Sequence, residues 1–405
     1  MEKQEMLRNG SSMPELKSMS PEQRREAVLE ARGLGSEWKG VMRGGDASQV
    51  AMADRMVENA IGVITIPYGI ATNFIINGKE SLIPMASEEP SVIAAASNAA
   101  KMARSGGGFR AEANDEWWGR GTIYITDLQD PDAARLRVIN AERKLRRIAN
   151  RIMRERSSTT VSKGGGVMEI DARRLKTMKD TIAVEVFVDT RDSGGQNTIN
   201  TVLEAMTEQL IDLSGGRALM RINTNYDDRK MVKATATFRK EEVGGEKVVN
   251  DIVKAYEVAM ADPYRAATFN KGIMNGIVAV ALVTKQDTRA IEAAAHARAS
   301  HYPTSMSVNP YTRTRYGPLC SWRKDENGDL FGLLEMPMPV ARVGGATMYP
   351  EAQLGFKILD VDNVKELAEA MACVGLANNL AAQRALVCEG IQEGHMKLHN
   401  RKRAQ

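Results

Sequence analysis

The chain has 405 residues, of which 43% are hydrophobic and 26% charged, with a formal net charge of +4 at pH 7. This composition is ordinary for a soluble protein, and the length is sufficient for two or three domains with cores of their own. The net charge is too small to predict nucleic-acid binding by itself, and the mild excess of Lys and Arg suits an anionic small ligand equally well.

The cysteines and the lengths of the apolar runs indicate the cellular compartment in which the protein is found. Cys320, Cys373 and Cys388 are scattered along the chain, so the sequence predicts no disulfide framework and fits a reducing cytoplasm. No apolar run approaches the ~18–20 residues that span a bilayer, and the N-terminus has no apolar segment typical of a secretion signal. We therefore expect a cytoplasmic protein without a membrane anchor.

The N-terminal part is polar and helical in pattern, and it contains one unusual acid. Ser20 followed by Pro21 predicts the start of a helix. Glu58 lies in an otherwise apolar stretch, residues 52–74. A buried carboxylate is costly unless it is paired or protonated. We therefore expect Glu58 to be paired or protonated, and an ordinary capping or ion-pairing role is one explanation.

The next part of the chain has the pattern of a small α+β domain. Strand and helix signals follow one another in the order β-α-β-β-α-β, which is the order of the ferredoxin-like domains. Glycine-rich breaks flank this pattern, so we expect a domain at about 119–228 inserted into a larger domain formed by 1–118 and 229–390. The predicted elements are strand 121–127, helix 130–156, strands 167–173 and 181–190, helix 196–213 and strand 217–225.

A glycine-rich loop inside this domain, residues 192–197, joins a strand to the N-terminus of a helix. Backbone N–H groups and the helix dipole at such a junction favour an anion. An ordinary glycine-rich turn is the alternative, and the local sequence does not decide between the two. No G-x-G-x-x-G follows a first strand, so the pattern excludes a Rossmann dinucleotide site.

Three polar side chains stand out in the second half of the chain. An amphipathic pattern predicts a helix over residues 246–261, and Pro263 ends or re-aims that helix. Arg265, Lys271 and Asn275 follow among small and apolar residues. Because Lys271 and Asn275 are four residues apart, a helix places them on one face.

A buried apolar run, residues 276–283, separates this group from Asp287. A cation beside an apolar core, with a carboxylate at the far end of that core, is one way to build a site for an anionic carbonyl substrate. The alternative is a buried Lys271–Asp287 ion pair that only affects packing.

The C-terminal part predicts a hairpin, a helix and a short basic tail. Residues 316–341 suggest a hairpin with its turn at Glu326-Asn327-Gly328, and residues 364–391 a helix. His395 and His399 stand at i, i+4, the spacing of a metal pair. Because Glu389 and Glu393 do not complete a zinc motif, we expect no metal.

Several blocks together resemble one enzyme family. They are E-N-A-I-G at Glu58, P-M-A-S-E-E-P-S, D-S-G-G-Q-N at Asp192, D-P-Y-R-A-A-T-F-N-K-G-I-M-N-G-I, L-E-M-P-M-P and G-H-M at His395. In this order they resemble the soluble, class II hydroxymethylglutaryl-CoA reductases, over Met13 to His399. The resemblance implies a large, mainly helical domain around a long central helix, and an inserted ferredoxin-like cofactor domain. It also implies a homodimer with active sites between subunits.

The resemblance also implies a reaction and four catalytic residues. Family members reduce 3-hydroxy-3-methylglutaryl-CoA to mevalonate and CoA with two nicotinamide hydrides, in isoprenoid synthesis. By this likeness Glu58 is the acid, Lys271 stabilises the oxyanion with Asp287 beside it, and His395 in the tail 391–405 protonates the CoA thiolate. Carboxylates near one another raise one pKa, which keeps a proton donor available. An imidazole pKa near ~6.5 suits a thiol pKa near ~8.5.

The substrate and cofactor contacts follow in the same way. Arg265 suits bidentate binding of the substrate carboxylate, Asn275 orders Lys271, and Lys17 lies where the class has a basic residue near the CoA phosphates, although a solvated lysine is the usual case. The family has D-A-M-G-x-N in the cofactor loop, and this chain departs from it at Ser193 and Gly194. The cofactor residues implied are Asp192, Ser193, Gly194, Gly195, Asn197 and Asn225.

The end of the first helix of the small domain suggests NADPH over NADH. NADH-using relatives carry an Asp after an A-N-R triplet, and this chain has Met153 at that position, with Glu155 two residues on. Arg154, Arg156 and Ser157 are donors that a ribose 2′-phosphate would use. Alternatively, the two Arg side chains only complement the helix dipole.

Two other function classes stay open. One is the same fold operating in the oxidative direction with NAD and CoA, and the other is a non-catalytic homologue that binds acyl-CoA. All four catalytic positions are filled, which argues against the second.

Overall fold

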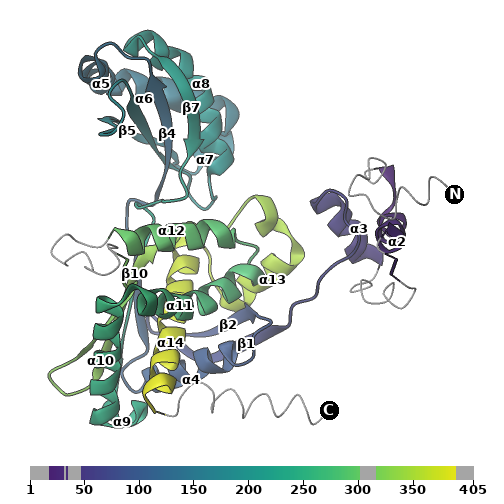
Figure 1. Ribbon diagram of the computed structural model, residues 1–405, viewed down its shortest axis with the longest axis vertical. Coiled ribbons are helices and arrows are strands. Elements are labelled where there is room, and N and C mark those ends of the chain that lie inside the picture. The colour runs from purple at the N-terminus through teal and green to yellow at the C-terminus, as the bar shows by residue number, and fades with distance from the viewer. Residues whose placement is uncertain (1–17, 32, 35–46, 302–315, 389–405) are drawn as a thin grey trace. The chain divides into compact units, whose positions relative to one another are not determined.

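The computed structural model describes residues 18–31, 33–34, 47–301 and 316–388. Lys17 and His395 lie outside these ranges. The chain divides into two compact units, Met1–Pro67 and Tyr68–Gln405. Figure 1 labels the elements of both.

The described part of the first unit holds helices α2 (Pro21–Ala31) and α3 (Ala47–Met56). The predicted start of α2 is confirmed, because the Ser20 N–H donates to Gln23 Oε1 at 2.9 Å and the Gln23 N–H to Ser20 Oγ at 3.3 Å. Arg24 forms an ion pair with Asp54 of α3. This ion pair links the two helices.

The second unit contains a six-stranded sheet with the order β2-β1-β3-β8-β10-β9. Neighbouring strands are antiparallel except at the single pair Ile76–Phe109, where β1 and β3 run parallel. The β9–β10 hairpin confirms the predicted one, with Gly328 at φ 81° in its turn. The strands are β1 (Tyr68–Ile76), β2 (Lys79–Ala86), β3 (Phe109–Ala113), β8 (Met231–Phe238), β9 (Cys320–Lys324) and β10 (Leu330–Pro337).

Helices pack against this sheet around one hydrophobic core. The 25-residue α14 (Val364–Cys388) packs on α11 (Pro263–Val283), and Figure 1 shows the two helices crossing. Gly276 allows the close approach, since a Cβ there would lie 2.5 Å from Asn378 Oδ1. The other helices are α4 (Val92–Arg104), α9 (Lys240–Val243), α10 (Glu246–Ala261), α12 (Thr288–Ser300), the 3-10 turn η3 (Gly345–Met348) and α13 (Pro350–Leu359). The large domain was expected to be mainly helical. This expectation is incomplete, because the six-stranded sheet forms much of this core.

Helix α11 corrects the expectation about apolar runs. It has 21 residues and a mean hydropathy of 1.4 over its most apolar window, which is long and apolar enough to cross a membrane. However, 61% of that window is buried inside the protein. Its apolar composition is therefore explained by its place in the core.

A four-stranded sheet in residues 118–223 has the order β5-β6-β4-β7, with every neighbouring pair antiparallel. Its helices cover one face and share with it a second hydrophobic core. The single predicted helix at 130–156 is two helices, broken at Ala141. The elements are β4 (Trp118–Thr126), α5 (Pro131–Asn140), α6 (Glu142–Arg156), α7 (Ser158–Ser162), β5 (Gly166–Arg174), β6 (Ile182–Asp189), α8 (Gln196–Ser214) and β7 (Arg217–Asn223).

Candidate functional site

Helix α11 begins at Pro263, where we expected the preceding helix to end or change direction. Asp262 ends α10 and accepts a hydrogen bond from the Tyr264 N–H at 3.0 Å, and Pro263 takes the first helical position. The helix therefore carries Arg265, Lys271 and Asn275 on one rigid element.

Lys271 has an acidic partner that the sequence analysis missed. Its Nζ lies 3.1 Å from Oε2 of Glu89, and the two side chains are 63% and 39% exposed. Glu89 belongs to the P-M-A-S-E-E-P-S block, in the turn between β2 and α4, where its N–H donates to Ser87 Oγ at 3.1 Å. The structure thus places a cation and a carboxylate together at an accessible surface.

The rotation of α11 about its axis is fixed next to Lys271 by a buried amide. Asn270 Oδ1 accepts from the Leu319 N–H at 2.8 Å, and Nδ2 donates to the Gly317 carbonyl at 3.0 Å and to Tyr316 Oη at 3.1 Å. Because Asn270 is fully buried and bonded on both sides, the next residue, Lys271, projects about 100° further around the helix, on its exposed side.

Asp287 does not contact Lys271 of the same chain. Its Oδ1 caps α12 by accepting from the Ala290 N–H at 3.2 Å, and it lies 3.4 Å from Arg289 Nε. The Gln286 N–H still bonds to the Ala281 carbonyl, so Asp287 follows directly on the end of α11. At 1.5 Å per residue, ten helical residues separate Lys271 from Ala281 by about 15 Å. The predicted pairing is therefore wrong within one chain.

Arg265 is half-buried and projects from a different side of α11 than Lys271 does. Its Nη2 donates to Gln383 Oε1 of α14 at 2.8 Å, and its guanidinium lies over the Phe269 ring at 5.7 Å. Burial lowers the pKa of Arg265, although an arginine stays charged at neutral pH. Asn275 is also half-buried, one turn beyond Lys271.

Glu58 follows α3 in the first unit and is exposed there, so it is not the buried carboxylate that its apolar surroundings suggest. Glu58 belongs to the first unit and Lys271 to the second, and the catalytic role of Glu58 stays a prediction.

The loop that follows β6 is braced on one side by Asp192. Its carbonyl accepts from the N–H groups of Arg342 (2.7 Å) and Val343 (3.1 Å), and its Oδ1 accepts from the N–H of Val364, the first residue of α14, at 3.0 Å. This carboxylate therefore has a structural task in addition to the cofactor role predicted for it.

The remaining loop residues lead into α8. Ser193 Oγ donates to the Thr190 carbonyl at 3.0 Å, and Gly194 is half-buried. Gly195 has φ 88°, and a Cβ there would lie 2.4 Å from Thr190 Cγ2, so the turn requires glycine. Asn197 and, on a separate segment after β7, Asn225 are exposed.

The end of α6 corrects one assignment. Met153 is fully buried in the core of the small sheet, so it cannot be a position that faces a cofactor ribose. Arg154, Glu155 and Arg156 are exposed, and Ser157 follows as a half-buried residue.

Within the described ranges, no group of three His, Cys, Asp or Glu side chains is arranged to hold a metal ion. His395 and His399 lie outside these ranges. All three cysteines are free thiols.

Comparison with known proteins gives a consistent result. The family described as hydroxymethylglutaryl-coenzyme A reductase matches residues 20–400. The 3-hydroxy-3-methylglutaryl-coenzyme A reductase of Archaeoglobus fulgidus is 43% identical over 394 residues, 96% of this chain and 86% of that protein. A probable reductase of the same name from Borreliella burgdorferi is 33% identical, over 85% of this chain and 76% of its own length. The class II reductase of Streptococcus pneumoniae, solved bound to NADPH in open conformations, aligns with a TM-score of 0.79 at 36% identity, covering 93% of this chain and 89% of that one.

Proposed function

This chain belongs to the hydroxymethylglutaryl-CoA reductase family, and we propose that the surface around Lys271 and Glu89 is its reaction centre. The chain is an oxidoreductase that reduces 3-hydroxy-3-methylglutaryl-CoA to mevalonate and CoA, with NADPH as the cofactor. We place the reaction centre here because Lys271 pairs with Glu89 at 3.1 Å. Lys271 lies on α11, the helix that contains the longest family motif.

The residue types account for the chemistry. Bound NADPH supplies hydride to the thioester carbonyl carbon, and the carbonyl oxygen becomes an oxyanion that the Lys271 ammonium stabilises. Glu89, in contact with Lys271, can give a proton to that oxygen. The hemithioacetal so formed returns its hydroxyl proton to Glu89 as its C–S bond breaks, which gives the aldehyde and CoA as a thiolate. We assign the protonation of this thiolate to His395 because of the G-H-M motif. The resulting aldehyde takes the second hydride at the same centre.

Substrate binding is assigned to three further residues. Arg265 presents a guanidinium, held by Gln383, that can bind the substrate carboxylate. Asn275 lies one turn from Lys271 and can donate to the substrate carbonyl. We keep Lys17 as a contact of the CoA phosphates, on the resemblance alone.

We propose a homodimer in which each centre uses both subunits. Within one chain Asp287 follows the end of α11, and ten helical residues already place Ala281 about 15 Å from Lys271. If both act on one substrate, Asp287 must come from a second copy, and its carboxylate then keeps Lys271 charged.

Mixing two inactive variants tests this arrangement. We expect Lys271→Ala and Asp287→Asn to be inactive alone, and to regain activity after being unfolded and refolded together. A random mixture puts half of the subunits in mixed dimers with one intact centre each, so recovery should approach about a quarter of wild-type activity. The NADPH absorbance at saturating substrate gives the measurement. Absence of recovery, with mixed dimers present in native mass spectra, would contradict shared centres.

We place the cofactor at the loop of Asp192, Ser193, Gly194, Gly195 and Asn197, together with Asn225. Two features support the loop: a glycine turn and the free N-terminus of a 19-residue helix. The strand order β5-β6-β4-β7 supports a ferredoxin-like cofactor domain at 119–228, with 1–118 and 229–390 as the substrate domain. Free cysteines and the buried position of α11 support a cytoplasmic location.

Arg154 and Arg156 are proposed to select the ribose 2′-phosphate, with Ser157 beside them. We expect Arg154→Ala/Arg156→Ala to lower kcat/KM for NADPH by about ten- to a hundredfold, because two charge-assisted contacts are lost. The value for NADH should change little. The same substitutions at Arg143 and Arg147, on the same helix, provide the control. An unchanged NADPH/NADH ratio would refute this assignment.

The whole proposal is tested with the purified full-length protein. We expect NADPH oxidation that depends on 3-hydroxy-3-methylglutaryl-CoA and releases free CoA thiol, with two NADPH consumed per thiol. Reduction of NAD by mevalonate and CoA at a far higher kcat/KM would instead indicate the oxidative direction. No turnover in either direction, with acyl-CoA still bound, would indicate a binding protein.

A further inference from the structure

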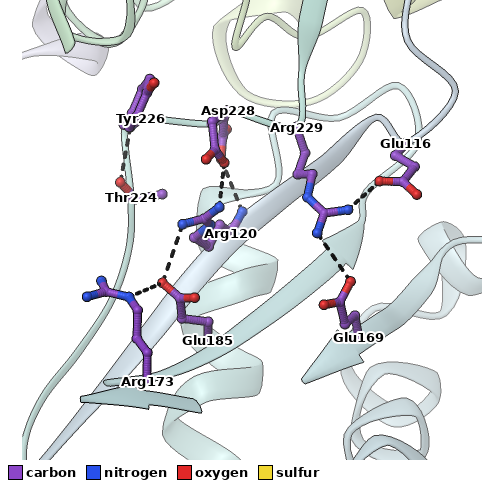
Figure 2. Close-up of polar contacts among 10 residues, drawn as sticks. Glu116, Arg120, Glu169, Arg173, Glu185, Thr224, Tyr226, Asp228 and Arg229 are labelled. Carbon is purple, nitrogen blue, oxygen red and sulfur yellow. Dashed lines mark hydrogen bonds and ion pairs between the residues drawn. The ribbon is translucent and has the colours of Figure 1, made fainter. Parts of the chain in front are cut away.

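The segment from Thr224 to Lys230, which we call the connector, joins β7 to β8 and lies against the face of the small sheet that carries no helices. Figure 2 shows how it is held. Arg120 of β4 reaches Asp228 at 2.6 Å, and Arg229 reaches Glu169 of β5 at 3.4 Å. The connector is therefore fixed to two strands, and with it the exposed Asn225.

Two further contacts strengthen this attachment. The guanidinium groups of Arg120 and Arg229 lie over the Phe187 ring at 4.9 and 4.8 Å. Arg120 also bonds to Glu185 at 3.3 Å. Each arginine thus contacts both an acid and an aromatic ring, so the connector has little freedom to move.

Lys230, the last residue of the connector, is a buried cation. Its side chain is 1% exposed, and its Nζ lies 3.3 Å from Asp227 Oδ2 and 3.2 Å from the carbonyl oxygen of Gly194. Asp227 Oδ1 in turn accepts from the Arg120 N–H at 3.1 Å. A buried ammonium is costly unless it is paired and hydrogen-bonded. Its partners here lie on two segments that are far apart in the sequence.

The contact with Gly194 reaches the loop that we assign to the cofactor. Asp192 braces the start of that loop against α14, and Lys230 holds it two residues further on. The Lys230 carbonyl also accepts from the Met338 N–H at 2.8 Å, so its own backbone is anchored. Lys230 therefore sets the distance between the loop and the connector that carries Asn225.

We propose that Lys230 is a positioning residue for the nicotinamide dinucleotide. Its buried ammonium fixes residues 192–197 against the connector, so that the N-terminus of α8 and Asn225 face the same cofactor. Lys230 itself does not touch the cofactor, because its ammonium is enclosed. This inference rests on the proposed cofactor site.

The test separates positioning from plain stability. Lys230→Met keeps the length and apolar stem of the side chain but removes the ammonium. We expect the KM and Kd for NADPH to rise by about tenfold or more, since small displacements of binding groups have large effects. The KM for 3-hydroxy-3-methylglutaryl-CoA should stay within about twofold, because the Lys271 centre is untouched. Lys230→Arg, which keeps the charge, should recover part of the NADPH affinity.

Asp329→Asn is the matched control. Asp329 is equally buried and accepts from the Lys240 N–H at 2.9 Å and from Arg239 at 2.8 Å, at the other end of β8. Asp329→Asn should lower the melting temperature without changing the KM for NADPH.

If both variants change the two KM values alike, or if Lys230→Met leaves NADPH affinity unchanged, the positioning role is wrong. If Lys230→Met does not fold, Lys230→Arg takes its place in the test. A Lys230→Arg protein that is less stable than the wild type but binds NADPH with wild-type affinity would also overturn the positioning role. A wild-type protein that binds no NADPH would instead refute the proposed function.

Discussion

Lys271→Ala is expected to lower kcat for thioester reduction by about 10²–10³-fold, because it removes the cation that stabilises the developing oxyanion. The fold should remain intact. The Lys271–Glu89 pair is largely exposed, and exposed ion pairs contribute little to the free energy of unfolding. Steady-state NADPH oxidation gives kcat, and thermal unfolding gives the change in stability.

Lys254→Ala is the control for this variant. Lys254 is also an exposed lysine on a helix, paired with a glutamate, and its Nζ lies 2.7 Å from Glu257 Oε2. If the effect of Lys271→Ala came from losing a surface ion pair, both variants would behave alike. A Lys271→Ala enzyme within a few fold of wild type would remove Lys271 from the chemistry.

Local signals in the sequence predicted two features of the segment that forms α11, namely the break after the preceding helix at Pro263 and the burial of residues 276–283. Asp262 and Pro263 fix the start of the helix, and the apolar run after Asn275 requires burial. The sequence did not show that this segment is long and apolar enough to cross a membrane, because Arg265 and Lys271 interrupt its apolar residues near the start of the helix. Polar residues near one end do not stop a helix from filling the core when they project from its accessible face.

Apart from the β9–β10 hairpin, the large sheet could not be predicted from local patterns. In β1 the pairing register shifts between Ala71 and Phe74, and Asn73 adopts φ 72°, so the alternation of a regular strand is interrupted. β8 lies in the middle of the sheet between β3 and β10. Its small and polar residues, such as Ala234 and Ala236, become core only through these distant partners.

The same limit applies to the site. Lys271 and Glu89 are 182 residues apart in the sequence, and only tertiary packing brings them together. Asp287, by contrast, is close in sequence to Lys271, which makes it look like the partner. The helix between them rules that out within one chain. A motif therefore identifies the residue types of a site better than it identifies which of them are in contact.

Glu89→Gln is expected to lower kcat by about 10²–10⁴-fold, the range for losing a positioned general acid. The substitution keeps the size of the side chain and a hydrogen bond to Lys271, but the amide N–H protons are not acidic enough to be transferred to the oxyanion. We choose Glu89 for this role because it contacts Lys271. Glu58→Gln should accordingly have the smaller effect of the two.

Glu88→Gln separates the role of Glu89 from general effects of charge. Glu88 is the neighbouring, exposed acid in the same turn, so neutralising it changes the charge of the surface equally, and we expect kcat within about twofold of wild type. Turnover measured with 3-hydroxy-3-methylglutaryl-CoA and with mevaldehyde should fall together in Glu89→Gln, because both steps form an oxyanion that takes a proton. If Glu58→Gln loses activity and Glu89→Gln keeps it, the proton comes from Glu58, and Glu89 only neutralises Lys271 in the absence of substrate.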